Sequence, residues 1–139
     1  MELDEPLKTR LRQRVEHQIT LETIKDVDAL YQMIDPAIRR EGAEEHGLEP
    51  ERTVSAIRQF VNQVRSARFV GLDIEASTPD GGQSRGNRPT AIVITKVVYN
   101  DRLAATVFRT PWVLDNDEWY TTALGKIGSR NAQPNYEQP

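Results

Sequence analysis

Cysteine is absent from this 139-residue chain. Its absence excludes disulfides, thiol nucleophiles and zinc sites built on thiolates. Long apolar runs are also missing, because no stretch approaches the roughly 20 residues needed to cross a bilayer. The first six residues are acidic and polar, so no signal peptide is expected in the sequence as written. Together these absences predict a cytoplasmic protein that does not associate with membranes.

Several functional signatures are missing as well. The formal net charge of −3 does not favour nucleic acid as a partner. The two histidines, His17 and His46, have no serine or carboxylate at a spacing typical of a catalytic dyad, so exposed, inert side chains are favoured. The glycines of residues 81–86 are not followed by Lys-Ser or Lys-Thr, which argues against a phosphate-binding loop. No metal-ligand spacing is found, and no cofactor is expected.

The first half of the chain has helical periodicity. Residues 3–24 carry an apolar residue at every fourth position, and the stripe changes phase at 20–26, which predicts a break before a second helix capped by Asp26 or Asp28. Pro36 predicts the end of that helix, with at most one further turn. A polar loop is expected over 41–50, and a third helix after Pro50. Its stripe consists of Val54, Ile57, Phe60, Val61 and Val64.

From Arg68 the period changes to two, which is typical of strands. In residues 69–76, Val70, Leu72, Ile74 and Ala76 are expected on one face. Further strands are predicted over 90–99, 103–114 and 118–124, with turns at Asn100–Asp101 and at 115–117, and with Pro111 at a bulge or an edge. Residues 125–139 are expected to form a flexible tail. Helices followed by strands predict one α+β domain over 1–124, in which N-terminal helices pack on a curved antiparallel sheet.

Two segments resemble the NTF2-like (cystatin-like) superfamily, which includes SnoaL-like and ketosteroid-isomerase-like domains. Residues 24–36, with the sequence IKDVDALYQMIDP, are similar to the short helix that follows the first helix in that family. Residues 112–120, WVLDNDEWY, are similar to its last hairpin. The resemblance implies a cone-shaped domain with a pocket between a bent sheet and a long helix, and frequent homodimers. It does not imply one reaction, because the family includes isomerases, dehydratases, cyclases, transport adaptors and domains without known activity.

Five residues are candidates for ligand binding: Tyr31, Asp73, Glu75, Arg109 and Trp112. Asp73 and Glu75 share one face of a strand, and such a pair can carry out acid–base chemistry if one carboxyl is desolvated, although a solvent-facing pair is favoured. Tyr31 can aim its hydroxyl into a cavity, or simply belong to the core with the hydroxyl at its rim.

Arg109 can bind a carboxylate with two parallel hydrogen bonds. Trp112 lies near it in the sequence, together with Trp119 and Tyr120, and these aromatic residues can form a pocket wall, a dimer face or ordinary core.

Three hypotheses about function follow from these residues and from the resemblance. The favoured one is a non-catalytic domain that binds a small apolar or acidic ligand or mediates dimerisation. The alternatives are an isomerase- or dehydratase-type enzyme with a pocket carboxylate, and a structural domain whose cone is filled by side chains.

Overall fold

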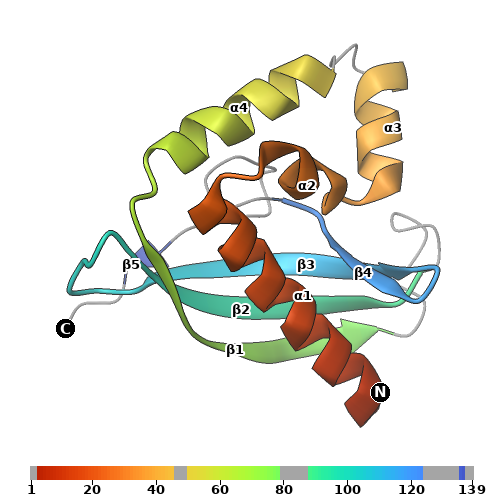
Figure 1. Cartoon of the computed structure of the whole chain (residues 1–139). Coiled ribbons are helices and arrows are strands. Elements are labelled where there is room, and N and C mark those ends of the chain that lie inside the picture. The colour runs from red at the N-terminus through yellow and green to blue at the C-terminus, as the bar shows by residue number, and fades with distance from the viewer. Residues whose placement is uncertain (1–2, 46–49, 79–87, 124–134, 137–139) are drawn as a thin grey trace.

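The computed structural model describes residues 3–45, 50–78, 88–123 and 135–136. Helices come first and one antiparallel sheet follows, as predicted (Figure 1). The helices are α1 (Glu5–Ile24), α2 (Val27–Gln32), α3 (Pro36–Glu45) and α4 (Pro50–Asn62). The strands are β1 (Ala67–Thr78), β2 (Thr90–Tyr99), β3 (Thr106–Asp115), β4 (Glu118–Thr121) and β5 (Asn135–Tyr136). The fold class is α+β, and α1 crosses one face of the curved sheet.

The sheet is a meander with strand order β1-β2-β3-β4. Both predicted turns are confirmed. Asn100 and Asp101 have φ angles of 55° and 57°, and Asn116 and Asp117 have φ angles of 51° and 65°. Asn and Asp tolerate this left-handed backbone better than other residues with a side chain. Asn116–Asp117 joins β3 and β4 directly as a tight hairpin, whereas Asn100–Asp101 is a turn at the start of a longer connection, because β3 begins at Thr106 and not at the predicted residue 103. The sequence did not predict β5, which pairs with Thr106–Val107 at the start of β3. The remainder of the predicted tail lies outside the described residues.

The structure of β1 differs from the regular two-residue alternation that the sequence predicted. The pairing with β2 shifts register between Phe69 and Gly71 and again between Ile74 and Ala76, which marks two β-bulges. Each bulge adds one residue and so exchanges the two faces of the strand. Phe69 consequently packs into the core together with Leu72 and Ile74, whereas Val70 is 48% exposed and Ala76 also faces solvent.

The break between the first two helices lies where the phase change predicted it. Asp4 caps α1 by accepting a hydrogen bond from the Leu7 amide at 3.0 Å. Lys25 ends α1 in the left-handed conformation, with a φ angle of 61°. Asp26 caps α2 by accepting a hydrogen bond from the Ala29 amide at 3.2 Å. At both helix starts, a short acidic side chain accepts a local hydrogen bond from a backbone amide and so defines where the helix begins.

Pro36 begins a helix, and the prediction of at most one turn there and of a loop over 41–50 is wrong for residues up to Glu45. A proline is well suited to the first helical position because its missing N–H needs no partner there. Asp35, just before it, is buried and accepts a hydrogen bond from the Ala37 amide at 3.1 Å. Arg88 binds the same carboxylate in bidentate fashion, at 2.6 Å and 2.8 Å. α3 is therefore fixed at its start by tertiary contacts that helix periodicity does not encode.

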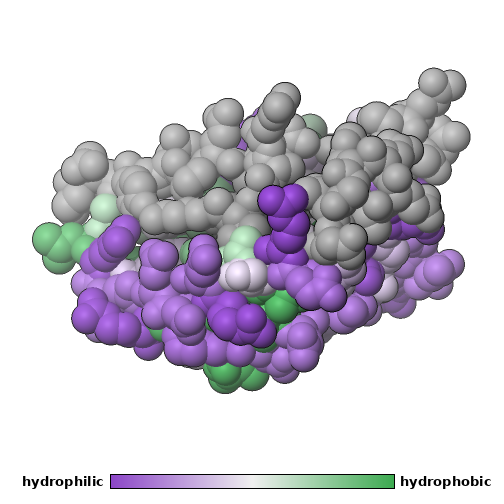
Figure 2. Space-filling view, turned by 90° about the horizontal axis from the view of Figure 1, so that it is seen from above, coloured by the Kyte–Doolittle hydropathy of each residue, from purple (hydrophilic) through white to green (hydrophobic). Residues whose placement is uncertain are grey.

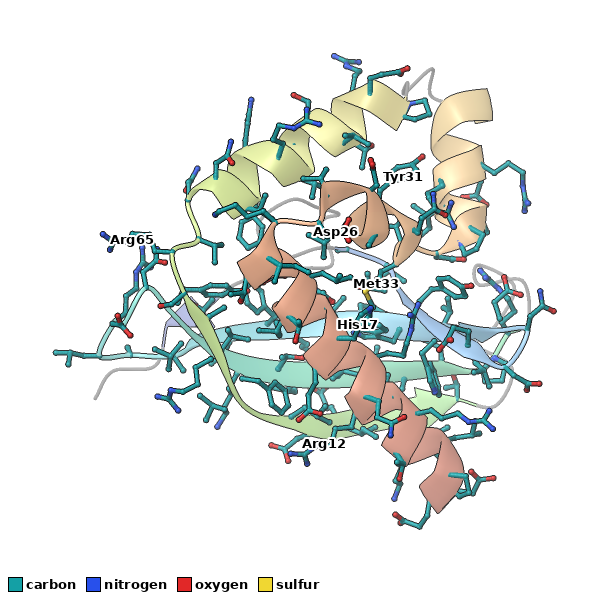
Figure 3. The ribbon with its side chains drawn as sticks, viewed as in Figure 1. Arg12, His17, Asp26, Tyr31, Met33 and Arg65 are labelled. Carbon is teal, nitrogen blue, oxygen red and sulfur yellow. The ribbon has the colours of Figure 1, made fainter. Side chains whose placement is uncertain are left out.

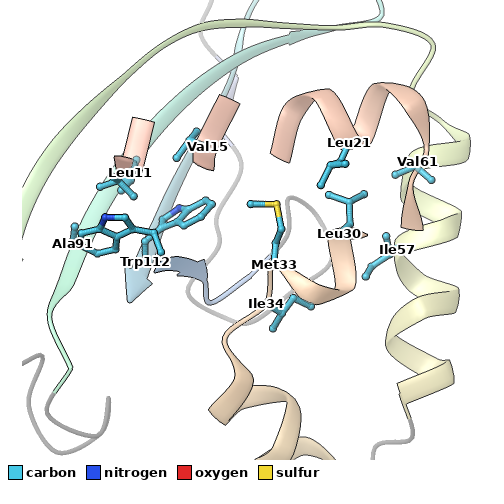
Figure 4. Close-up of a cluster of buried hydrophobic side chains, with 12 residues drawn as sticks. Leu11, Val15, Leu21, Leu30, Met33, Ile34, Ile57, Val61, Ala91 and Trp112 are labelled. Carbon is cyan, nitrogen blue, oxygen red and sulfur yellow. The ribbon is translucent and has the colours of Figure 1, made fainter. Parts of the chain in front are cut away.

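The main hydrophobic core joins the helices to the inner face of the sheet, defined here as the face that α1 covers. Leu11 and Val15 of α1 lie on the side of Trp112, whereas Leu21 and Leu30 point toward α4 (Figure 4). A second cluster meets α1 at Ile19 and consists of Ile19, Val64, Val97, Tyr99 and Phe108. Of the described residues that are visible from above, most are hydrophilic, and the hydrophobic ones form small patches (Figure 2). Among the described residues, no helix combines the length and the apolar character needed to span a bilayer.

Lys25 connects the end of α1 to the end of α4, and this contact can be tested. Its ammonium donates hydrogen bonds to the carbonyl oxygens of Val61 and Val64. We expect Lys25→Ala to lower the free energy of unfolding by about 1–2 kcal/mol, because two charge-assisted hydrogen bonds are lost. Lys25→Gly loses the same bonds but adopts a positive φ without strain, so it should be about 1 kcal/mol more stable than the alanine variant. Urea denaturation measures both, and a glycine variant less stable than the alanine variant contradicts this account.

Candidate functional site

A carboxyl group is buried between α1 and β2. Glu22 lies near the end of α1 and is 1% exposed. Its Oε1 accepts a hydrogen bond of 2.6 Å from the Tyr99 hydroxyl, and its Oε2 accepts one of 3.0 Å from the Gln18 side-chain amide. Fully buried carboxylates are rare, because removing the charge from water costs several kcal/mol unless partners compensate. This trio is therefore a candidate for function.

The surroundings of Glu22 change its acidity. Burial raises the pKa of the Glu22 carboxyl from its ordinary value of 4.5 to about 7, although the hydrogen bonds from Tyr99 and Gln18 act in the opposite direction. Burial also raises the pKa of the Tyr99 hydroxyl above its ordinary range, and the neighbouring charge of Glu22 and the hydrogen bond to it add to that rise. Near neutral pH, Glu22 can consequently gain or lose a proton while Tyr99 keeps its own.

A small cavity, called the inner cavity here, adjoins this trio. Its volume is about 20 Å³, which is enough for about one water molecule. Two members of the trio, Gln18 and Tyr99, line it, and the hydroxyl-bearing Thr95 and Thr110 lie on its sheet side. Trp112 is a further wall residue. Glu22 itself is not part of the lining, so it acts on the cavity through its two partners.

A second space, called the outer pocket, lies at the hairpin end of β2 and β3. It has a volume of about 60 Å³ and opens to solvent. Tyr99 and Phe108 line both spaces, so the two spaces adjoin each other. The Tyr99 ring packs edge-on against Phe60, at 6.0 Å between ring centroids, and against Phe108, at 6.2 Å. The other lining residues are Gln63, Val64, Asn100, Arg102 and Thr106.

The buried threonines at these spaces have hydroxyls without partners. Thr95, Thr106 and Thr110 are 6%, 2% and 6% exposed. In the described part of the chain, no side-chain hydrogen bond involves these three hydroxyls. Yet none of the fully enclosed side-chain nitrogen or oxygen atoms there lacks a hydrogen-bond partner. The three hydroxyls therefore reach the open volume of the two spaces, where a water or a ligand can bond them.

Three of the predicted site residues lie on the other face of the sheet. Glu75 and Arg109 form a bidentate ion pair across β2, with bonds of 2.9 Å and 2.8 Å. The hydrogen bond from Arg109 lowers the pKa of the Glu75 carboxyl, and the same bond raises the pKa of Arg109. Asp73 is exposed on the same strand. The favoured interpretation of Asp73 and Glu75 as a solvent-facing pair is thus confirmed, and none of the three lines the inner cavity or the outer pocket.

Tyr31 and Trp112 have different surroundings. Tyr31 is half-buried on α2 near α3 and α4, and the Arg39 guanidinium stacks on its ring at 5.4 Å (Figure 3). It lines neither interior space, whereas Trp112 lines the inner cavity. His17 is exposed on α1, as predicted, and His46 lies outside the described residues, as do the glycines of 81–86.

The surface groove beside His17 is larger than either interior space, at about 480 Å³. It runs between α1 and the β3–β4 turn. Two arginines line it, Arg10 and Arg14, and Arg14 is already bonded to the Glu118 carboxylate at 3.1 Å and to the Trp119 carbonyl at 2.9 Å. In the described residues, no group of three or more His, Asp or Glu side chains converges on a point where a metal ion could bind. The interior trio is consequently the stronger candidate site.

The sequence did contain a signal for this trio. Leu11, Val15, Gln18 and Glu22 are spaced four, three and four residues apart, which places all four on one face of α1. Two polar residues therefore interrupt the core-facing stripe. A buried polar residue is more informative than an exposed apolar one. Tyr99 and the threonines gave no such signal, because both residue types are common in strands.

The acidity of Glu22 predicts how stability depends on pH. Its folded-state pKa of about 7 is higher than the ordinary value of 4.5, so the folded protein holds the proton more tightly. The contribution of this proton to the free energy of unfolding is complete below pH 4.5 and is lost as the pH rises to about 7. The loss amounts to about 3 kcal/mol. Glu22→Gln should remove this dependence in urea denaturation between pH 4.5 and 8. Glu16→Gln, at an exposed position of the same helix, is the control, and an equally steep loss in the Glu22→Gln variant contradicts the assignment.

Comparison of the chain with known protein families, with curated proteins and with solved structures found no match. The structure by itself is compatible with the NTF2-like resemblance, since helices precede a curved antiparallel sheet. A functional argument for this protein therefore rests on the geometry of Glu22, its partners and the two interior spaces.

Proposed function

We propose that this chain is a non-catalytic NTF2-like domain that binds a small molecule between α1 and the inner face of the sheet. The ligand has an apolar body and one hydrogen-bonding head group. The body occupies the outer pocket, and the head group reaches the polar inner cavity. The order of the elements and the curvature of the sheet support the family, and the lining of the two spaces supports the ligand.

The observation that carries this proposal is the set of unpaired threonine hydroxyls. Threonine and valine have nearly the same shape, so valine would fill the same positions without burying a hydroxyl. A hydroxyl that found no partner in such a space would cost about 1–3 kcal/mol, so a water or a ligand group is expected to bond it. Thr95 and Thr110 lie beside the Gln18 amide, so three polar groups converge on one small space. Convergent polar groups among apolar walls are typical of ligand sites.

The outer pocket supports an apolar ligand body. Phe60, Tyr99 and Phe108 give it aromatic walls, and such walls bury apolar area with little loss of side-chain freedom. Gln63 and Asn100 place amides at the same pocket. Asn100 is held rigidly, because its side chain accepts hydrogen bonds from the Arg65 and Ser66 amides. The pocket is therefore largely preformed, which lowers the entropic cost of binding.

Homodimerisation stays a prediction. The large hydrophobic side chains that are exposed in the described residues are Ile24, Val70 and Leu103. They belong to α1, to β1 and to the β2–β3 connection. Single exposed apolar residues are common on monomers and do not by themselves indicate an interface. Ligand binding is consequently better supported than dimerisation.

A proton-transfer enzyme of the isomerase or dehydratase type is the second candidate, because the pKa of Glu22 lies near 7. The carboxyl is separated from the inner cavity by Gln18 and Tyr99, so non-catalytic binding is preferred. Cyclohexanone in D₂O distinguishes the two. An enzyme would exchange the α-hydrogens of this ketone faster than its Glu22→Gln variant does, whereas a binding domain leaves the exchange rate unchanged.

The two tryptophans provide a test of the binding site. Trp112 lines the inner cavity, whereas the Trp119 indole donates a hydrogen bond to the Leu7 carbonyl at 3.1 Å and lies on neither lining. We expect millimolar cyclohexanol to shift the indole NMR signal of Trp112 and to leave that of Trp119 in place. If neither signal moves at saturating concentrations, the proposed function is wrong.

Matched variants locate the head group. Thr110→Val keeps the shape of the wall and removes one hydroxyl, so the affinity for cyclohexanol should fall about fivefold, which corresponds to one neutral hydrogen bond. Thr78→Val, at an exposed position of β1, is the control and should leave the affinity unchanged. Equal affinities for the wild type and Thr110→Val would show that the ligand does not reach the inner cavity.

A further inference from the structure

Glu22 controls which hydrogen-bonding atoms its two partners present to the inner cavity. The Tyr99 hydroxyl has a single proton, and that proton is used in the 2.6 Å bond to Glu22. One N–H of the Gln18 amide is used in the 3.0 Å bond to the same carboxyl. With the carboxylate ionised, both partners must donate to it. What remains of Tyr99 for the cavity is its oxygen, which is an acceptor, whereas Gln18 keeps both its amide oxygen and a second N–H.

We propose that Glu22 is a specificity-determining, positioning residue, and that its carboxylate form selects ligands whose head group donates a hydrogen bond. An apolar alcohol is the ligand class that fits. Its hydroxyl proton bonds the Gln18 or Tyr99 oxygen, and its oxygen accepts from Thr95 or Thr110, whose hydroxyls can rotate. A ketone of the same size can accept from these threonines, but it has no proton to offer the Tyr99 oxygen, so it makes one hydrogen bond fewer. This inference rests on the proposed ligand-binding function.

Protonation of Glu22 reverses the preference. The protonated carboxyl donates its own hydrogen bond, and the Tyr99 oxygen is the nearest acceptor, at 2.6 Å. The Tyr99 hydroxyl keeps its proton and can then donate its hydrogen bond into the cavity, where a carbonyl oxygen of the ligand can accept that bond. The same pocket thus changes from a site for donors into a site for acceptors, without movement of the backbone.

Few other groups can interfere with this exchange. Within the described residues, hydrogen bonds reach Glu22 only from Gln18 of α1 and Tyr99 of β2. Phe60 of α4 and Phe108 of β3 pack on the Tyr99 ring and carry no charge. Two cations lie nearby. Lys25 is bonded to the carbonyl oxygens of Val61 and Val64, and Arg102, which lines the outer pocket, is an arginine and stays charged throughout the pH range of the test. A pH effect on ligand preference is therefore expected to follow the protonation of Glu22.

The experiment compares cyclohexanol with cyclohexanone, which have the same ring and differ in the proton of the head group. Both dissociation constants are measured from the Trp112 indole signal of the full chain between pH 5 and 9. At pH 8.5 the alcohol should bind about fivefold more tightly than the ketone, and at pH 5.5 this preference should disappear or reverse. The midpoint of the change should lie within the pH window in which Glu22 titrates.

Two variants separate the inference from a general pH effect. In Glu22→Gln the group at position 22 does not titrate, so the alcohol-to-ketone ratio should be independent of pH. In Tyr99→Phe the switching proton is absent, so the ratio should change less than in the wild type. The wild-type pH series decides the matter even if a variant does not fold. Binding of both probes with a constant ratio overturns the inference and leaves the binding function intact, whereas binding of neither overturns both.

Discussion

The hydrogen bond that Glu22 accepts from Tyr99 joins the C-terminal part of α1 to the inner face of the sheet, and a second bond, from Gln18 of the same helix, orients the Glu22 carboxyl. Tyr99 is also the residue on which Phe60 of α4 and Phe108 of β3 pack. One buried carboxyl thus organises the place where helix, sheet and second cluster meet. Replacing a buried charged group by an apolar one of similar volume is often neutral or stabilising. Its presence here is therefore better explained by function than by stability.

The periodicity of the sequence predicted the fold class because each signal was local. The phase change at 20–26 marked a break that Lys25 and Asp26 produce, and the pairs Asn100–Asp101 and Asn116–Asp117 form turns because their side chains tolerate positive φ. The errors have a tertiary cause. The bulges of β1 arise from pairing with β2, and the start of α3 depends on Arg88, which lies 53 residues after Asp35 in the chain. Local patterns do not contain such partners.

The candidate site was harder to predict than the fold for the same reason. Arg109 and Glu75 looked suitable for ligand binding because both are polar and lie on strands, but they bond each other on the exposed face. Glu22 was missed because it lies 77 residues before Tyr99, and a sequence does not show which strand residue a helix will meet. For Trp112 the sequence left a pocket wall, a dimer face and ordinary core open, and the residue both lines the inner cavity and belongs to the main core. Gln18 and Glu22 on an apolar stripe were the overlooked signal.

The central claim is that Glu22 is buried and desolvated next to the proposed ligand site, and its own titration tests the burial most directly. Selective ¹³C labelling of the glutamate side chains allows the Glu22 carboxyl carbon to be followed by NMR as the pH is changed, with Glu22→Gln used to assign the signal. The account predicts a midpoint near pH 7, well above the ordinary value of 4.5. A midpoint at or below that ordinary value would show a solvated or strongly paired carboxylate, and would contradict the account.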